Sequence, residues 1–206
     1  MAIKNNPNII LQFHIELTGI DPIIWRSIQV PAKYNFWDLH VAIQDAMGWL
    51  DYHLHAFRVK MPRKKKLIEI GIPTEDYDDE PTTPGWEVLL TDYFKEPGKL
   101  APYTYDFGDG WEHNVLLEGI LLKENEVKYP KCIGGQRACP PEDCGGIPGY
   151  YDFIEILRDP KHPDYQGHIE WLKGHAKNYY PYDPDYFNPD EVEFWDPKKR
   201  WKMAFS

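Results

Sequence analysis

The segment Tyr103–His113 constrains the fold of this 206-residue chain more than any other stretch. It reads Tyr-Thr-Tyr-Asp-Phe-Gly-Asp-Gly-Trp-Glu-His. The pair Asp109-Gly110 is of the kind that supplies positive φ at a two-residue hairpin turn, and Gly108 adds backbone freedom just before it. Beyond the turn, apolar and polar residues alternate, which indicates a strand with one buried face. The segment therefore predicts a β-hairpin whose second strand continues to Leu122.

The same hairpin collects acidic and aromatic side chains around its turn, so it is the first candidate for a binding surface. Its alternation places Trp111 and His113 on one face of the strand and Glu112 on the other. The candidate binding residues are Asp106, Asp109, Trp111, Glu112 and His113.

The region before the hairpin predicts two strands and a helix. Residues Ile9–Leu17 alternate in polarity, a turn follows at Thr18–Pro22, and Ile24–Val30 reads as a second strand that Pro31 ends. Asn35 is a favourable N-cap for a helix through Met47, and Gly48 is a favourable C-terminal stop. An antiparallel hairpin followed by a helix is therefore expected at the N-terminus.

Further elements are weaker in the sequence. The expected strands are His55–Lys60 and Leu67–Ile70, and the expected helices are a short one from Leu89 or Thr91 to Lys95, capped by Thr91, one from Gly149 or Tyr150 to Leu157, and Pro163–Lys173. Asn188-Pro189-Asp190-Glu191 has the form of a helix start. The stretches Arg63–Lys66, Pro73–Gly85 and Lys123–Pro148 have the composition of turns and loops.

These elements predict an α+β fold: a single domain with a mixed, largely antiparallel sheet and helices packed on it. No internal repeat and no linker divides the chain. We expect one domain over residues 1–195 and a basic, aromatic C-terminal tail over residues 196–206.

Charge and composition exclude several classes of function. The formal net charge of −10 argues against a general binder of nucleic-acid phosphates, so a protein or a small ligand is the expected partner. Only two serines occur, Ser27 in a predicted strand and Ser206 at the end, which leaves serine nucleophile chemistry almost without a candidate. No apolar run approaches membrane length and no signal-peptide pattern opens the chain, so we expect a cytoplasmic protein without a membrane partner.

The cysteines point to a possible metal. Cys132, Cys139 and Cys144 lie in one Gly- and Pro-rich window and could bind zinc, with His113, His53 or His55 completing a tetrahedron. Against this, their spacing lacks the tight pairs of zinc knuckles, and small buried residues that close a loop would give the same pattern. Zinc is the candidate cofactor.

A mixed nitrogen and oxygen site is the second possibility. His53 and His55 fall on one face of an extended segment and could join Asp106, Asp109 and His113 around a metal ion. A metal-dependent, hydrolytic enzyme would then use Glu112 or Glu142 as a general base. The interpretation that we favour for these two histidines is ordinary hydrogen bonding at the start of a strand.

Two basic segments, Lys60–Lys66 and Lys198–Lys202, could contact phosphates, with Trp201 stacking on a base. Short basic runs of this kind are more often solvated turns and termini.

Four motifs in order give the chain a family resemblance. They are Pro22-Ile-Ile-Trp-Arg26, Phe36-Trp-Asp-Leu-His-Val-Ala-Ile-Gln-Asp-Ala-Met-Gly-Trp49, Tyr105-Asp-Phe-Gly-Asp-Gly-Trp-Glu-His113 and Ala138-Cys-Pro-Pro-Glu-Asp-Cys-Gly-Gly146. From about Ile10 to Val192 the chain resembles the Ri-plasmid ORF-3-like family, also labelled passenger proteins of insertion elements. The resemblance implies an α+β domain with a mixed sheet, and it implies little about function. The function that we expect is a non-enzymatic binding or accessory module associated with mobile or plasmid DNA, with the metal-dependent enzyme as the alternative. A resolvase label that some members carry is not transferred, because a serine recombinase needs a nucleophilic serine near the N-terminus.

Overall fold

The N-terminal hairpin lies inside the sheet, next to one of its edge strands. In this computed structural model, which describes residues 6–60, 66–73 and 81–205, strands β1 (Ile9–Leu17) and β2 (Ile24–Pro31) pair antiparallel, with Phe13 opposite Ile28. The alternation of the sequence buries Leu11, Phe13 and Ile15 on one face of β1. It leaves Gln12, His14 and Glu16 half-buried on the other face. The hairpin expected from the sequence is confirmed.

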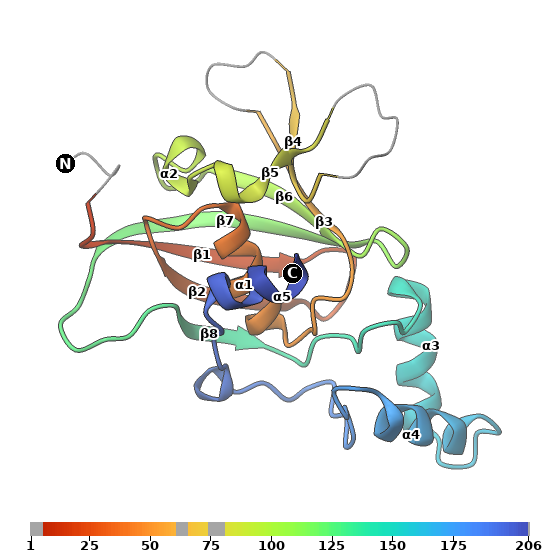
Figure 1. Ribbon diagram of the computed structural model, residues 1–206. Helices are drawn as coiled ribbons and strands as arrows, with labels where there is room; N and C mark the ends of the chain where they lie inside the picture. The colour runs from red at the N-terminus through yellow and green to blue at the C-terminus, as the bar shows by residue number, and fades with distance from the viewer. Residues whose placement is uncertain (1–5, 61–65, 74–80, 206) are drawn as a thin grey trace.

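Across the described residues, eight strands form one sheet in the order β5-β4-β3-β6-β7-β1-β2-β8 (Figure 1). The other strands are β3 (His55–Val59), β4 (Ile68–Gly71), β5 (Thr83–Pro84), β6 (Leu100–Tyr105), β7 (Trp111–Leu122) and β8 (Lys131–Gln136). β4 and β5 pair parallel and every other neighbouring pair is antiparallel. The sheet is therefore mixed and largely antiparallel, and the predicted α+β single-domain fold is confirmed.

Helix α1 (Phe36–Met47) covers the inner face of the sheet. Asn35 caps it in a capping box with Asp38, and Gly48 ends it at a φ of 91°, as its sequence predicts. Phe36 packs between the rings of Phe57 and Phe94, and the buried residues of helix and sheet form one hydrophobic core. Each such large side chain contributes about 2 kcal/mol through burial.

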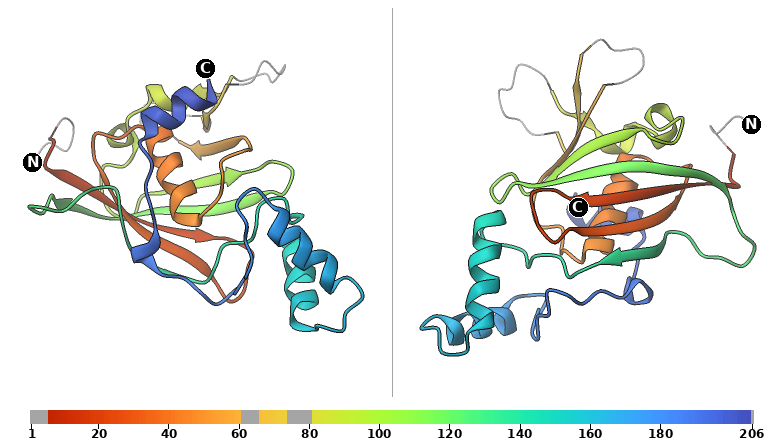
Figure 2. Two further views of the ribbon diagram at one scale, coloured as in Figure 1. Left: turned by 60° about the horizontal axis from the view of Figure 1, so that its bottom comes forward. Right: turned by 180° about the vertical axis from the view of Figure 1, so that it is seen from behind.

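The remaining helices lie beside this core. α3 (Gly146–Arg158) and α4 (Tyr165–Gly174) pack side by side beyond one end of the sheet, whereas α5 (Pro197–Ala204) crosses α1 (Figures 1 and 2). The short elements are η1 (Gly85–Glu87), α2 (Leu90–Tyr93) and η2 (Pro189–Glu191). Seen from behind, none of the helices formed by the described residues lies over the outer face of the sheet (Figure 2). Among the helices of the described residues, none combines the length and apolarity that crossing a bilayer requires.

The central hairpin forms as predicted, but its turn is longer. β6 ends at Tyr105 and β7 begins at Trp111, so residues 106–110 make the connection. Positive φ occurs at Asp106 (54°) and Gly110 (68°), not at Asp109. The Asp106 carboxylate accepts bonds from the amides of Gly108 and Asp109, which stabilises the wider turn. The predicted two-residue turn is therefore wrong.

Three other expectations need correction. The stretch read as a structureless loop contains β8, which pairs with β2 at the edge of the sheet. Thr91 lies inside α2, whose N-cap residue Leu89 makes no side-chain cap. The helix start at Asn188 produces only the single 3₁₀ turn η2, although Asn188 does accept a bond from the Asp190 amide.

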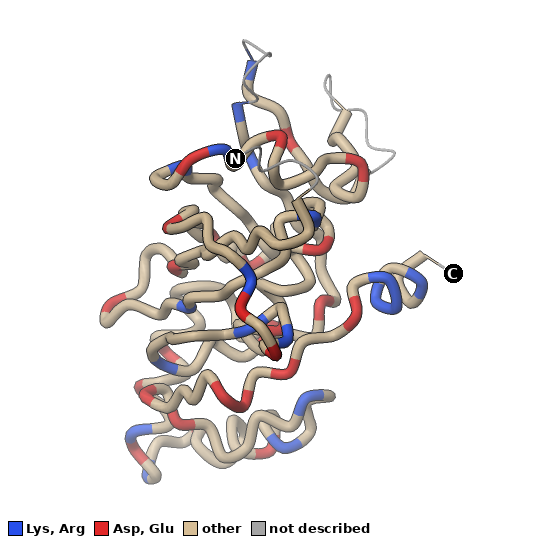
Figure 3. Tube along the Cα trace, turned by 90° about the vertical axis from the view of Figure 1, so that its left-hand side faces the viewer, with Lys and Arg blue, Asp and Glu red and all other residues tan. Residues whose placement is uncertain are grey.

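The C-terminal segment is a structured helix. Figure 3 shows its Lys and Arg residues together on α5, near the C-terminus. Arg200 forms ion pairs with Asp45 (2.8 Å) and Asp51 (3.4 Å), and the Trp37 indole donates to the Pro197 carbonyl (3.1 Å). Most of the other basic tract, at Arg63, Lys64 and Lys65, lies outside the described residues.

Candidate functional site

One group of metal-ligating side chains comes together at the turn end of the central hairpin. His53, Asp106 and Asp143 each direct a ligand atom into a common space, with all three atoms within 4.8 Å of one another. His53 Nε2 lies 2.9 Å from an Asp143 carboxylate oxygen and 3.6 Å from Asp106 Oδ2. We call these three residues the hairpin-end cluster.

The cluster takes one residue from each of three separate segments. His53 precedes β3, Asp106 follows β6, and Asp143 belongs to the loop between β8 and α3. Asp106 and Asp143 both have left-handed backbone conformations, with φ of 54° and 60°. Such conformations are uncommon for residues with a side chain, and they turn both carboxylates toward His53.

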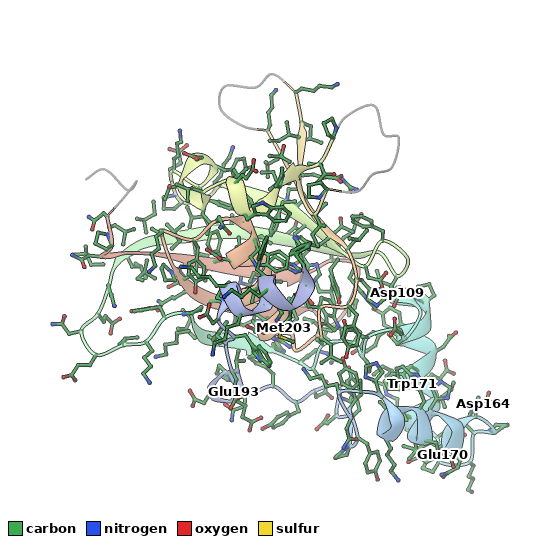
Figure 4. The ribbon with its side chains drawn as sticks, in the orientation of Figure 1. Asp109, Asp164, Glu170, Trp171, Glu193 and Met203 are labelled. Atoms are coloured by element: carbon green, nitrogen blue, oxygen red, sulfur yellow. The ribbon has the colours of Figure 1, made fainter. Side chains whose placement is uncertain are left out.

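The loop bearing Asp143 packs closely on the hairpin turn. Asp109 accepts a hydrogen bond from the Gly145 amide (3.2 Å), and Figure 4 labels Asp109 at the turn, beside the first residues of α3. Gly146 has a φ of 67°, and a Cβ there would lie 2.5 Å from the Asp109 carbonyl oxygen. Glycine at this position therefore allows the loop to approach the hairpin.

The buried carboxylate of Glu142 connects all three segments. It is 1% exposed, accepts a hydrogen bond from the Leu50 amide (2.7 Å), and accepts another from the Tyr105 hydroxyl. The Tyr105 hydroxyl in turn accepts a bond from the Tyr52 amide (3.1 Å). Tyr52, Tyr105 and Glu142 are the direct neighbours of the three cluster residues, so this network fixes where His53, Asp106 and Asp143 lie.

The same network determines which groups can exchange protons. Burial, followed by the hydrogen bond to Glu142, raises the pKa of Tyr105, so its hydroxyl remains a donor at neutral pH. Both Glu142 oxygens are engaged, and Glu112 is exposed on the outer side of β7. Neither glutamate is placed as the general base that the enzymatic hypothesis requires.

The cluster fits a divalent cation of intermediate hardness. One imidazole nitrogen and two carboxylates suit Mn²⁺, Fe²⁺ or Zn²⁺, and three protein ligands leave further coordination positions for water or a ligand. The exposed fractions of the side chains rise from 11% for Asp106 through 30% for His53 to 53% for Asp143. An ion could therefore enter from the Asp143 side.

The three cysteines do not belong to the hairpin-end cluster. Within the described residues, Cys132, Cys139 and Cys144 belong to no group of three ligand atoms, and they are free thiols. Burial raises the pKa of Cys139 to about 12, which disfavours the thiolate that zinc binds. Of the cysteines and histidines expected to bind zinc, the structure places only His53 in a candidate metal site.

His55 and His113 point into the core of the domain. His55 stacks on His40 with ring centroids 3.4 Å apart, and burial lowers its pKa well below the usual value. His113 is 1% exposed, and burial lowers its pKa to about 3. Its ring nitrogens have no side-chain hydrogen-bond partner among the described residues. Both histidines are therefore neutral packing residues at neutral pH.

The candidate binding residues of the hairpin are divided among different environments. Trp111 is 1% exposed and packs near Trp49, so it belongs to the core with His113. Asp106 and Asp109 lie at the turn, where Asp109 contacts the loop and Asp106 joins the cluster. The structure thus brings Asp106 together with His53, leaves Asp109 on the same turn outside the cluster, and places Glu112 on the exposed side of β7.

Sequence reasoning did not propose Asp143 as a ligand, although it lies beside Glu142 in the Cys-Pro-Pro-Glu-Asp-Cys motif.

The sequence also did not predict a hydrogen-bond network that joins Asp51 to His40 Nε2 (2.7 Å) and His40 Nδ1 to the Tyr103 hydroxyl (2.8 Å). Arg200, 149 positions further along the chain, binds the other oxygen of Asp51. Contacts over that separation leave no local pattern in a sequence.

Comparisons with known proteins match most of the length of this chain. A family model described as plasmid pRiA4b ORF-3-like protein matches residues 9–191. The uncharacterized protein y4hQ of Sinorhizobium fredii is 33% identical over 162 residues, covering 79% of this chain and 80% of y4hQ. A crystal structure of protein MM3350 from Methanosarcina mazei, described as of unknown function, is 40% identical with a TM-score of 0.79. That match covers 92% of this chain and 100% of MM3350.

Proposed function

This chain belongs to the plasmid pRiA4b ORF-3-like family, and we propose that it is a non-enzymatic binding module that holds a divalent cation at the hairpin-end cluster. One observation carries the proposal: ligand atoms from three separate segments lie within 4.8 Å of one another. The shared network around Glu142 supports it, because positioning of this kind raises metal affinity.

The partner that we propose is a protein or a small ligand, and the association with mobile or plasmid DNA follows from the family description alone. The net charge of −10 opposes direct binding of phosphates. Arg200 on α5 is already paired with two aspartates, so it is not available for a phosphate. We expect any connection to DNA to run through a partner protein.

A metal-dependent hydrolase is the second candidate function, and the open coordination positions favour it. A cation with only three protein ligands can activate a water molecule. The engaged oxygens of Glu142 and the outward position of Glu112 weigh against it. The test is hydrolysis of bis(p-nitrophenyl) phosphate and of p-nitrophenyl acetate by the Mn²⁺-loaded protein. Activity that Asp106→Asn abolishes would show that the protein is an enzyme and would overturn the binding-module proposal.

Titration with Mn²⁺, followed by electron paramagnetic resonance of the free ion, tests the proposed site directly. We expect one Mn²⁺ per chain. Asp143→Asn replaces a charged ligand with a neutral one, and His53→Gln removes the imidazole, so each should weaken binding by about tenfold or more. Asp106→Asn keeps an oxygen that accepts from the Gly108 amide, so this variant removes the charge while preserving the turn.

Asp109→Asn is the matched control, because Asp109 lies on the same turn but outside the group of three ligand atoms. It should bind Mn²⁺ as tightly as the unaltered protein. If Asp109→Asn and Asp143→Asn lost Mn²⁺ affinity equally, the binding would depend on the general negative charge of the surface and not on the three ligand atoms. Absence of binding by the unaltered protein would overturn the cation site.

A further inference from the structure

A second region of the molecule has the features of a binding site for a small organic ligand. A cavity of about 920 Å³ lies between the C-terminal end of α1, the loop after β8 and the C-terminal segment. Figure 4 labels Glu193 and Met203 on the C-terminal side of its wall. Its size is within the range of ligand pockets in proteins.

Aromatic rings make up much of the wall, and most of them come from the segment that follows α4. They include Tyr52, Tyr179, Tyr182, Phe187 and Trp195. The ring of Phe187 covers one side of the Arg26 guanidinium, 3.7 Å from Cζ to the ring centroid. Planar surfaces of this kind favour a ligand with an aromatic ring.

Arg26, which belongs to the same wall, has an unusual environment. It is 1% exposed, yet it contacts backbone carbonyls instead of a carboxylate. Its Nε donates to Ala46 (2.9 Å), and its Nη1 donates to Trp25 (2.7 Å) and Gln136 (3.0 Å). Within the described part of the chain, Nη2 has no acceptor, and no carboxylate lies within 4.0 Å of the guanidinium.

Four carboxylates line the cavity, Asp45, Asp183, Glu191 and Glu193, and among the described residues none of them forms an ion pair with Arg26. Asp183 accepts from the Asp185 amide. Asp45 is paired with Arg200 and accepts from the Trp195 amide, and Glu191 accepts from the Tyr186 hydroxyl. Lys177 adds a second cation to the wall, where its ammonium group bonds the Gly48 carbonyl. A buried cation without an anion is costly, so this cavity is prepared for a negative group.

We propose that this cavity binds a small molecule bearing a carboxylate or phosphate on an aromatic ring, with the anion paired to Arg26 Nη2. The ring packs among the tyrosines and Trp195 of the wall. Lys177 adds attraction for the anion at the surface, since its residue is exposed. This site is separate from the hairpin-end cluster and does not depend on a bound cation.

Nuclear magnetic resonance of the Arg26 Nε–H group tests the proposal in the unaltered protein, because that group is hydrogen-bonded and buried. The probes are benzoate, phenyl phosphate, benzamide and inorganic phosphate. We expect saturable shifts of the Arg26 and Phe187 signals with benzoate or phenyl phosphate, and the preference between the two identifies the anionic group. Benzamide and inorganic phosphate should each bind about tenfold more weakly or worse.

Equal binding of benzamide and benzoate would mean an apolar cavity without anion recognition, and would overturn the proposal. Inorganic phosphate binding as tightly as phenyl phosphate would overturn it too, as would no shift with any probe. In a second experiment, Arg26→Gln should weaken benzoate binding by about tenfold or more. Arg58→Gln is its matched control, because Arg58 is an exposed arginine paired with Glu69. The spectra of the unaltered protein decide the matter if Arg26→Gln does not fold.

Discussion

The hairpin-end cluster and the cavity beside Arg26 solve opposite electrostatic problems. The cluster brings together two carboxylates and an imidazole, and a buried glutamate holds the segments that carry them. The cavity instead surrounds a buried guanidinium with carbonyls and aromatic rings. The cluster has an excess of negative charge, whereas the guanidinium of Arg26 has only carbonyls as hydrogen-bond acceptors. The two proposed sites therefore favour ions of opposite charge, although Tyr52 belongs both to the network around Glu142 and to the cavity wall.

The largest effect should come from Glu142→Ala. This change leaves the Tyr105 hydroxyl and the Leu50 amide without their buried acceptor, so we expect a loss of about 3 kcal/mol in the free energy of unfolding. Mn²⁺ affinity should fall by about tenfold or more, while benzoate binding to the folded protein persists. Urea unfolding and the two titrations measure these effects.

Glu118→Ala is the control for that variant, because Glu118 is also hydrogen-bonded but is 36% exposed on the outer face of the sheet. Its cost should stay below about 1 kcal/mol. If both variants unfolded at the same urea concentration as the unaltered protein, Glu142 would not organise the cluster.

Acid should destabilise the domain through histidines outside both sites. Burial lowers the pKa of His113 to about 3. His113 therefore binds a proton near pH 6.5 in the unfolded chain but stays neutral at that pH in the folded chain. Stability from this residue is present above pH 6.5 and falls as pH decreases toward 3, by about 1.4 kcal/mol per pH unit. His55, whose pKa is also lowered, acts in the same direction.

His113→Phe should remove that contribution and flatten the dependence of unfolding free energy on pH between 6.5 and 4. His14→Phe is the control, since His14 lies on the outer face, 26% exposed. An unchanged slope in His113→Phe would show that His113 is protonated in the folded protein.

Arg200→Met should have a smaller effect, confined to the cavity side of the comparison. It removes the cation paired with Asp45 and Asp51, whose side chains are only 4% and 7% exposed, and should cost about 2 kcal/mol. Benzoate binding should change, because Arg200 and Asp45 belong to the cavity wall, while Mn²⁺ affinity stays the same. Thermal unfolding and both titrations test this. Loss of Mn²⁺ binding would show that the two regions are coupled through Asp51.

The smallest effect should belong to Asp109→Asn. Only the bond from the Gly145 amide is altered, and asparagine can still accept it, so the unfolding free energy should change by less than about 0.5 kcal/mol. Chemical denaturation measures the change. A larger loss would show that the charge of Asp109, not its hydrogen bond, holds the loop against the turn.

The parts of the fold that could be predicted depend on neighbours in sequence. Asn35 and Gly48 bound α1 through local hydrogen bonds, and the alternation of Ile9–Leu17 defines β1. β8 was missed because Gly134 and Gly135 interrupt the apolar pattern. Gly135 is needed there because a Cβ would lie 2.3 Å from Phe187, a residue about fifty positions away.

The candidate site followed the same rule. His53 and Asp106 could be singled out because imidazole and carboxylate groups stand next to predicted strands. Asp143 could not be separated from its neighbour Glu142, since only the folded loop shows which carboxylate is buried and which is exposed. Arg26 was visible only as part of a motif, because a guanidinium without a counter-charge is a property of its surroundings.

The order of the chain gives the two regions different histories during synthesis. The cluster is complete once Asp143 has been made, and its ligands come from the sheet and the loop that follows it. The cavity needs residues as late as Met203 for its wall. Synthesis from the N-terminus onward therefore supplies every ligand of the hairpin-end cluster before the last residues of the cavity wall.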